Sequence, residues 1–73
     1  MAATIKFPLE QEYIQLDHLL KAVGLCHSGG AAHAAVEAGE VRVDGQVESR
    51  KRAKIRLGQR VSFASELIQI VAP

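Results

Sequence analysis

The apolar residues of this chain change their spacing near residue 40, and this change limits the folds that the chain can adopt. Before it, the apolar residues at positions 16, 19, 20 and 23 follow the i, i+3, i+4, i+7 spacing of an amphipathic helix. After it, Val41 and Val43 stand on either side of a polar residue, as in a strand with two different faces. The order of strand, helix, helix and then several antiparallel strands predicts an α+β domain.

Two helices are predicted between residues 16 and 38. The first begins at Leu16 and ends at Gly24, which stands just past the last turn. Asp17 lies in its first turn, where a negative charge suits the helix dipole, so we expect a structural role for this residue. The second helix runs from Ser28, a good N-cap, to Ala38, and Gly39 ends it. Small residues on its buried stripe let the helices approach closely, and we expect a helix-turn-helix-like pair.

Short strands are predicted for most of the remaining chain. Thr4–Phe7 is a strand that Pro8 ends. The pair Asp44-Gly45 favours the two-residue type I′ turn of a hairpin, so the strand at residues 41–43 turns back on itself there. Two further strands are expected at residues 61–63 and 67–71, after a turn at residues 57–59.

The length and the cysteine count restrict the class of protein. A chain of 73 residues predicts one domain, residues 1–73. A single Cys cannot close an internal disulfide or build a Cys-rich zinc site, which is typical of a reducing compartment. We identify no signal peptide and no apolar run of the roughly 20 residues that cross a bilayer. We therefore expect a cytoplasmic protein without metal or cofactor, too small for a convincing enzyme.

Positive charge is concentrated in one short segment. Residues 1–40 hold two cations and five anions, whereas residues 41–73 hold seven cations and three anions. Five of the seven cations fall within residues 50–56, here called the basic segment: Arg50, Lys51, Arg52, Lys54 and Arg56. Such a cluster is either a solvated loop or a site for a polyanion, because Lys and Arg displace counterions from phosphates. We expect Ile55 to point into the core and to hold part of the segment rigid.

The start of the second helix is another candidate contact for phosphate. Ser28-Gly29-Gly30 combines an N-cap with two residues that leave backbone N–H groups accessible to an anion. His33 lies one turn further along the same face, and Lys21 lies on the polar face of the first helix. The alternatives are that the two glycines only allow a tight entry, and that His33 pairs with Glu37 in solvent.

Several residues recur at the spacing of a known RNA-binding module. They are Leu16-Asp17, Leu20, Gly24-Leu25, Ser28, Ala32, Val36, Gly39, Val41, Val43 and Gly45. With these residues the chain resembles the domain named after small-subunit ribosomal protein S4. The resemblance covers about residues 16–63, and its most distinctive parts are residues 41–45 and 48–55. The whole chain looks most like the small stand-alone bacterial members of this family, the YbcJ-like proteins.

The resemblance implies a helix pair packed on a small, strongly bent antiparallel sheet. In the family the helix pair and the adjoining loop face structured RNA. This chain departs from the family at two positions, because Gln15 and Gly29 stand where the family often has arginines. The cations of this chain therefore lie mainly in the basic segment instead of on the helices.

The function predicted from these features is non-enzymatic binding of structured RNA, such as ribosomal or transfer RNA. The binding is expected to use mainly backbone phosphates, because one Tyr and two Phe offer few surfaces on which single-stranded bases could stack. The protein is expected to act as a monomer. The alternative is a protein-interaction module on a ribosome-associated assembly, in which the basic segment meets an acidic protein surface.

Overall fold

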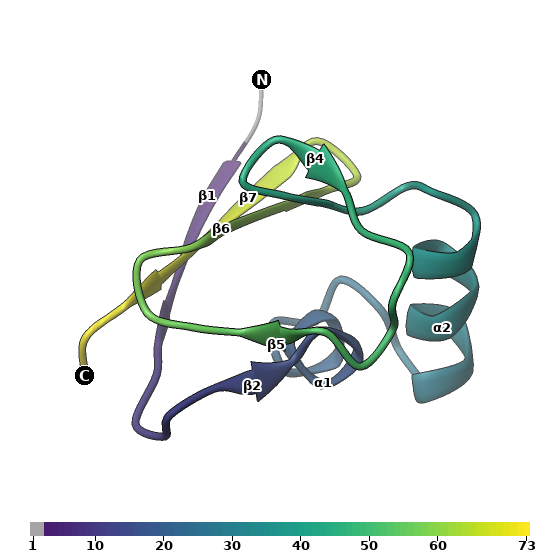
Figure 1. The fold of residues 1–73 in the computed structure, drawn as a ribbon. Helices are drawn as coiled ribbons and strands as arrows, with labels where there is room; N and C mark the ends of the chain where they lie inside the picture. The colour runs from purple at the N-terminus through teal and green to yellow at the C-terminus, as the bar shows by residue number, and fades with distance from the viewer. Residues whose placement is uncertain (1–2) are drawn as a thin grey trace.

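In the computed structural model, which describes residues 3–73, the chain forms a mixed set of short strands and two helices (Figure 1). The helices are α1 (Leu16–Ala22) and α2 (Gly29–Glu37). The strands are β1 (Ala3–Pro8), β2 (Ile14–Gln15), β3 (Arg42–Val43), β4 (Gln46–Val47), β5 (Lys54–Ile55), β6 (Arg60–Phe63) and β7 (Glu66–Val71). This arrangement confirms the α+β class and the predicted order of a strand, two helices and further strands, but β2 and β5 were not predicted.

Five strands make one sheet in the order β1-β7-β6-β3-β4, and β2 pairs with β5 in a separate two-stranded ribbon. The neighbours β7-β6, β6-β3 and β3-β4 are antiparallel, but β1 runs parallel to β7. The prediction of a purely antiparallel sheet therefore needs correction to a mixed sheet. Both helices and five strands separate β1 from β7, and a connection of this length allows two strands to point the same way.

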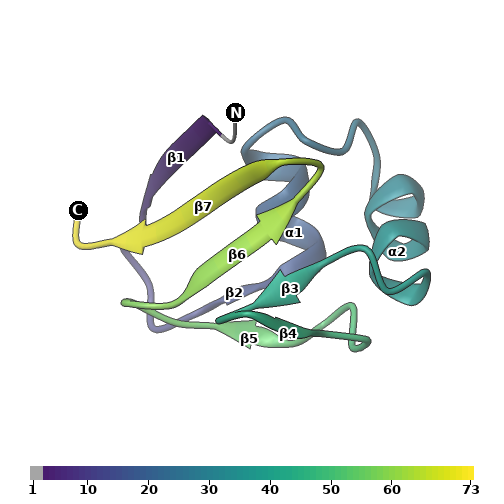
Figure 2. The same ribbon diagram turned by 90° about the horizontal axis from the view of Figure 1, so that it is seen from above.

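α1 lies against one face of the five-stranded sheet, whereas α2 lies beyond the sheet, to its side (Figures 1 and 2). α1 lies with the β2-β5 ribbon beneath the sheet, and α2 packs against α1 at the side. Aliphatic side chains fill the space between these layers, and the largest of those fully buried are Leu16, Leu19, Leu20, Val36, Val41, Ile55, Val61 and Ile68. Within residues 3–73, no helix covers the opposite face of the sheet (Figures 1 and 2). The exposed Arg42 and Arg60 lie next to the inward-facing Val41 and Val61.

Local signals placed the helix ends and the hairpin turn correctly. The Oγ of Ser28 accepts a hydrogen bond from the N–H of Ala31 at 3.1 Å, so Ser28 is the N-cap of α2. Asp44 and Gly45 have φ values of +51° and +85°, as a type I′ turn requires at both central positions. Neither helix in residues 3–73 has the length and apolar character that crossing a membrane would need.

Candidate nucleic-acid interface

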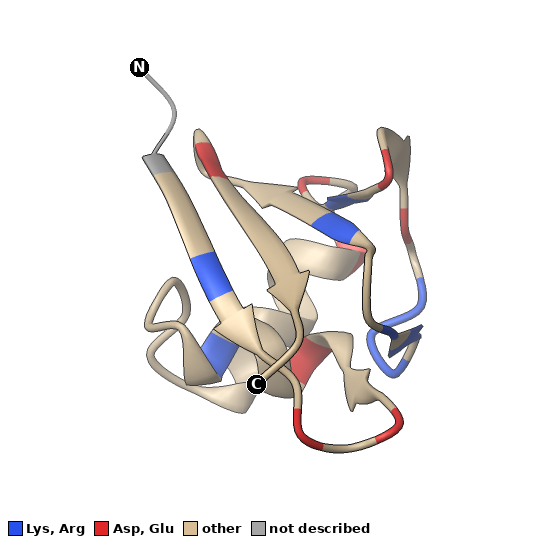
Figure 3. Ribbon diagram, turned by 90° about the vertical axis from the view of Figure 1, so that its left-hand side faces the viewer, with Lys and Arg blue, Asp and Glu red and all other residues tan. Residues whose placement is uncertain are grey.

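The first half of the basic segment is a tight turn. The N–H of Ala53 donates to the carbonyl of Arg50 at 3.1 Å, which places Lys51 and Arg52 at the tip. Figure 3 shows the Lys and Arg residues gathered along this loop, whereas β1 carries only Lys6 and β7 carries no cation.

The second half of the basic segment is the strand β5 and the residue after it. Ile55 is 1% exposed, while Lys54 and Arg56 on either side of it are exposed. The expected alternation is therefore confirmed. Ala53, also buried, is a second anchor between the turn and the strand.

The turn also caps the N-terminus of α1. Gln15, at the N-cap position, makes no capping hydrogen bond with its side chain. Instead, the N–H of Leu16 donates to the carbonyl of Ala53, and the N–H of Asp17 donates to the carbonyl of Lys51, both at 2.9 Å. The backbone of the basic segment thus satisfies N–H groups that the first turn of a helix leaves unpaired, and it fixes the turn against α1.

Asp17 connects α1 to α2 through a buried carboxylate. Its Oδ2 accepts a hydrogen bond from Nε2 of His33 at 2.9 Å, and its Oδ1 accepts one from the N–H of His18 at 2.9 Å. Burial acts to raise the pKa of Asp17, but the bonds from His33 and His18 outweigh it and hold the pKa below its usual value. The charged carboxylate therefore fixes the imidazole of His33, which does not form the alternative pair with Glu37.

The first turn of α2 presents an open backbone surface. A side chain added at Gly29 would meet nothing within 4 Å, and one at Gly30 would meet only the Oγ of Ser28 at 3.9 Å. The first N–H groups of a helix have no acceptor inside it, and the Oγ of Ser28 accepts from the N–H of Ala31. The N–H groups of Gly29 and Gly30 are therefore left without an acceptor inside the helix. This geometry leaves room for an anion at the start of α2.

These parts meet at one hollow of about 440 Å³. Lys21 from α1, Gly29 and His33 from α2 and Arg52 from the turn all line it. The structure thus brings together four predicted contact residues that are distant in sequence. Gln15, Asp17 and His18 complete the wall.

The cations differ in how they are already paired. Arg50 forms a bidentate ion pair with Glu48, in which Nε and Nη2 each lie 3.1 Å from a carboxylate oxygen. The hydrogen bond from the Arg50 side chain holds the pKa of Glu48 below its usual range. Lys51 lies 3.8 Å from Glu37, and Arg56 lies 3.4 Å from Glu12. Within the described part of the chain, three cations of the predicted site have no carboxylate within 4.0 Å: Lys21, Arg52 and Lys54.

An aromatic residue that the sequence did not predict as a contact lies beside these cations. The ring centroid of Tyr13 lies 5.0 Å from Nζ of Lys54 and 5.7 Å from Cζ of Arg56. The signal available in the sequence was the alternation Tyr13-Ile14-Gln15, which is too short to predict a strand. A chain with one Tyr and two Phe predicts little stacking surface, and Tyr13 is not among the contact residues predicted from the sequence.

The fold and the sequence together place the chain in a known family. The sequence model of the S4 domain matches residues 7–71, and the chain belongs to this family. Over 60 aligned residues it is 50% identical to the "Putative RNA-binding protein YbcJ" of Escherichia coli (strain K12). The aligned region covers 82% of this chain and 86% of that protein. The same values hold for the "Uncharacterized protein YbcJ" of Shigella flexneri.

A solved structure supports the same relationship. The solution structure of YbcJ from E. coli matches with a TM-score of 0.69 and 44% sequence identity, over 99% of this chain and 90% of that one. That structure is described as revealing an αL motif involved in RNA binding. The resemblance noted in the sequence is therefore confirmed.

Proposed function

We propose that this protein binds structured RNA, such as ribosomal or transfer RNA, mainly through backbone phosphates and without catalysing a reaction. The observation that carries this proposal is the hollow between α1, α2 and the turn, where Lys21, His33, Arg52 and the start of α2 face a common space. The names of its relatives support it, because YbcJ of E. coli is named as an RNA-binding protein and its structure is described with an RNA-binding motif.

The chemistry of the hollow suits a phosphate group. Arg52 offers a planar fork of donors, Lys21 a mobile point charge, and Gly29 a backbone N–H at a helix N-terminus. The turn is held in place by its backbone hydrogen bonds to α1 and by the buried side chains of Ala53 and Ile55. A rigid set of hydrogen-bond donors favours phosphates that are held at a fixed spacing. Structured RNA provides such a spacing, and a flexible single strand does not. We take the protein to act as a monomer in the cytoplasm.

Fluorescence anisotropy of a labelled RNA hairpin over a salt series tests the proposal. If about three to five cations meet phosphates, log affinity falls against log salt with a slope of roughly −2 to −4. The double substitution Lys51→Ala and Arg52→Ala should make the slope shallower by about one to two units and weaken binding about tenfold. It leaves the backbone carbonyl of Lys51 in place, so α1 stays capped.

The matched control removes the same charge from the uncovered face of the sheet. Arg42→Ala with Arg60→Ala should leave the slope nearly unchanged, because these residues lie away from the hollow. Equal losses of RNA affinity in the two double variants would mean that the RNA does not bind at the hollow. If no structured RNA binds in a salt-dependent way, the alternative of a protein-interaction module on a ribosome-associated assembly would be favoured.

A further inference from the structure

The outer face of the β2-β5 ribbon gathers an aromatic ring, an amide and two cations. Ile14 pairs with Ile55 and Gln15 pairs with Lys54 in this antiparallel ribbon. Continuing this register by one residue places Tyr13 opposite Arg56. Because side chains alternate along a strand and Ile55 points into the core, the outer face holds Tyr13, Gln15, Lys54 and Arg56.

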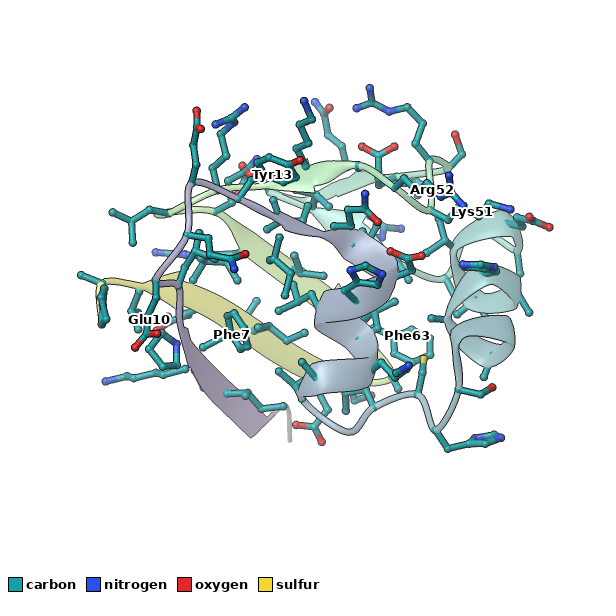
Figure 4. The ribbon with its side chains drawn as sticks, turned by 90° about the horizontal axis from the view of Figure 1, so that it is seen from below. Phe7, Glu10, Tyr13, Lys51, Arg52 and Phe63 are labelled. Atoms are coloured by element: carbon teal, nitrogen blue, oxygen red, sulfur yellow. The ribbon has the colours of Figure 1, made fainter. Side chains whose placement is uncertain are left out.

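A second hollow lies beside this ring. It measures about 410 Å³, and Tyr13, Gln15 and His18 are among the residues that line it. Gln15 and His18 also line the first hollow, at Lys21 and Arg52, so the two spaces adjoin. Figure 4 shows Tyr13 and Arg52 along the same edge of the molecule.

We propose that Tyr13 is a stacking site for one unpaired base of the bound RNA, next to the phosphate site. This inference rests on the proposed function and names the RNA more narrowly as a helix interrupted by an unpaired nucleotide. The base stacks on the ring of Tyr13, the amide of Gln15 donates to and accepts from the base edge, and Lys54 or Arg56 meets the attached phosphate.

The ribbon holds the ring of Tyr13 in a half-buried position, and the exposed Lys54 and Arg56 lie over it. For a base to stack on the face that they cover, these two side chains move aside toward the attached phosphate, which exposed side chains can do at little cost. The pair of Arg56 with Glu12 does not block the site. Its nitrogen-oxygen distance is 3.4 Å and both side chains are at least half exposed, so a phosphate can replace this carboxylate at little cost.

The test uses two RNA hairpins with the same stem. One carries a single unpaired 2-aminopurine as a bulge, and the other carries the 2-aminopurine paired within the stem. Wild-type protein should bind the bulged hairpin about five- to tenfold more tightly than the paired one, and binding should lower the 2-aminopurine fluorescence, because a base that stacks on an aromatic ring is quenched.

Two variants of Tyr13 assign the effect to the ring. Tyr13→Leu should remove both the preference and the quenching, while its affinity for the paired hairpin stays within about twofold of wild type. Tyr13→Phe keeps the ring and should behave as wild type. Thermal unfolding of each variant confirms that it is folded at the assay temperature.

The outcomes separate this inference from the proposed function. Equal wild-type affinity for both hairpins without quenching overturns the stacking site alone, and so does a preference that survives in Tyr13→Leu. If wild type binds neither hairpin, both the stacking site and the proposed function are overturned. Absence of quenching with wild type overturns the stacking site whether or not Tyr13→Leu folds.

Discussion

The two ends of the basic segment are both positively charged in the sequence, but they meet different surroundings in the structure. At the helix side, the carbonyls of Lys51 and Ala53 cap α1, and Arg52 lines the hollow at the start of α2. At the strand side, Lys54 and Arg56 lie over the ring of Tyr13. The first environment suits a phosphate, and the second suits a planar group beside a phosphate. A dense run of cations can thus supply two sites of different chemistry when buried residues divide it.

The largest effect should come from removing the anchor between the two ends. Ile55→Ala should lower the free energy of unfolding by about 3 kcal/mol, because this side chain is fully buried and its loss leaves a cavity. Denaturant unfolding measures the change. Leu57→Ala is the control, since Leu57 is 58% exposed and its loss should cost less than about 0.5 kcal/mol. A loss below about 1 kcal/mol in Ile55→Ala would show that Ile55 does not anchor the segment.

Asp17 supports only the helix side, so its replacement tests whether the two ends are independent. Asp17→Asn should lower the stability at neutral pH by about 1–2 kcal/mol, because a buried charged acceptor is lost. The folded-state pKa of Asp17 lies below 3.8, its ordinary value. Its charge therefore stabilises the fold above about pH 4, and this contribution is lost as the pH falls through the lower, folded-state pKa.

Denaturant midpoints measured between about pH 2 and 7 should show the gap between wild type and Asp17→Asn closing at the acidic end. Glu40→Gln, at an exposed position, is the control and should leave the midpoints unchanged. A gap that stays constant with pH would mean that the charge of Asp17 does not stabilise the fold.

The sequence predicted those features that depend on local contacts. The helical spacing of residues 16–23, the Ser28 cap and the Asp44-Gly45 turn each act within a few residues, so they could be located without the fold. The parallel pairing of β1 with β7 could not, because alternating side chains have the same pattern in either direction.

The candidate site could be predicted only in part. The density of cations indicated the basic segment, and two adjacent glycines after the N-cap Ser28 indicated the start of α2. The capping of α1 by the carbonyls of Lys51 and Ala53 has no signature in side chains, since every residue has a carbonyl. The Asp17–His33 contact joins residues 16 positions apart on different helices, and it depends on how the helices pack. The ten predicted contact residues therefore stay a prediction until RNA binding is measured.

Gly29→Asp should weaken RNA binding at the helix side by about five- to tenfold, through repulsion between carboxylate and phosphate. The fold should tolerate the change, because the added side chain meets nothing within 4 Å and an acid suits the first turn of a helix. Anisotropy measures affinity, and thermal unfolding measures stability. Gly29→Ala fills the same space without charge and should stay within about twofold of wild type. Equal or tighter binding by folded Gly29→Asp would remove the start of α2 from the interface.

The smallest effect should come from freeing Arg50 at the edge of the segment. Glu48→Gln removes the carboxylate that holds the guanidinium, so RNA affinity should rise about twofold. Glu10→Gln removes an equal charge from the exposed loop before β2 and should change affinity less. Weaker binding by Glu48→Gln would mean that the Glu48–Arg50 pair shapes the turn for RNA instead of competing with it.

The most direct test of the central claim is an amide nuclear magnetic resonance titration of the wild-type protein with a structured RNA hairpin. The account predicts that the largest shift changes fall on the start of α2 and the turn, at Gly29, Gly30, Lys51 and Arg52. The amides of Arg42 and Arg60, on the uncovered face of the sheet, should change little. The largest changes at Arg42 and Arg60, with small ones at Gly29 and Arg52, would contradict it.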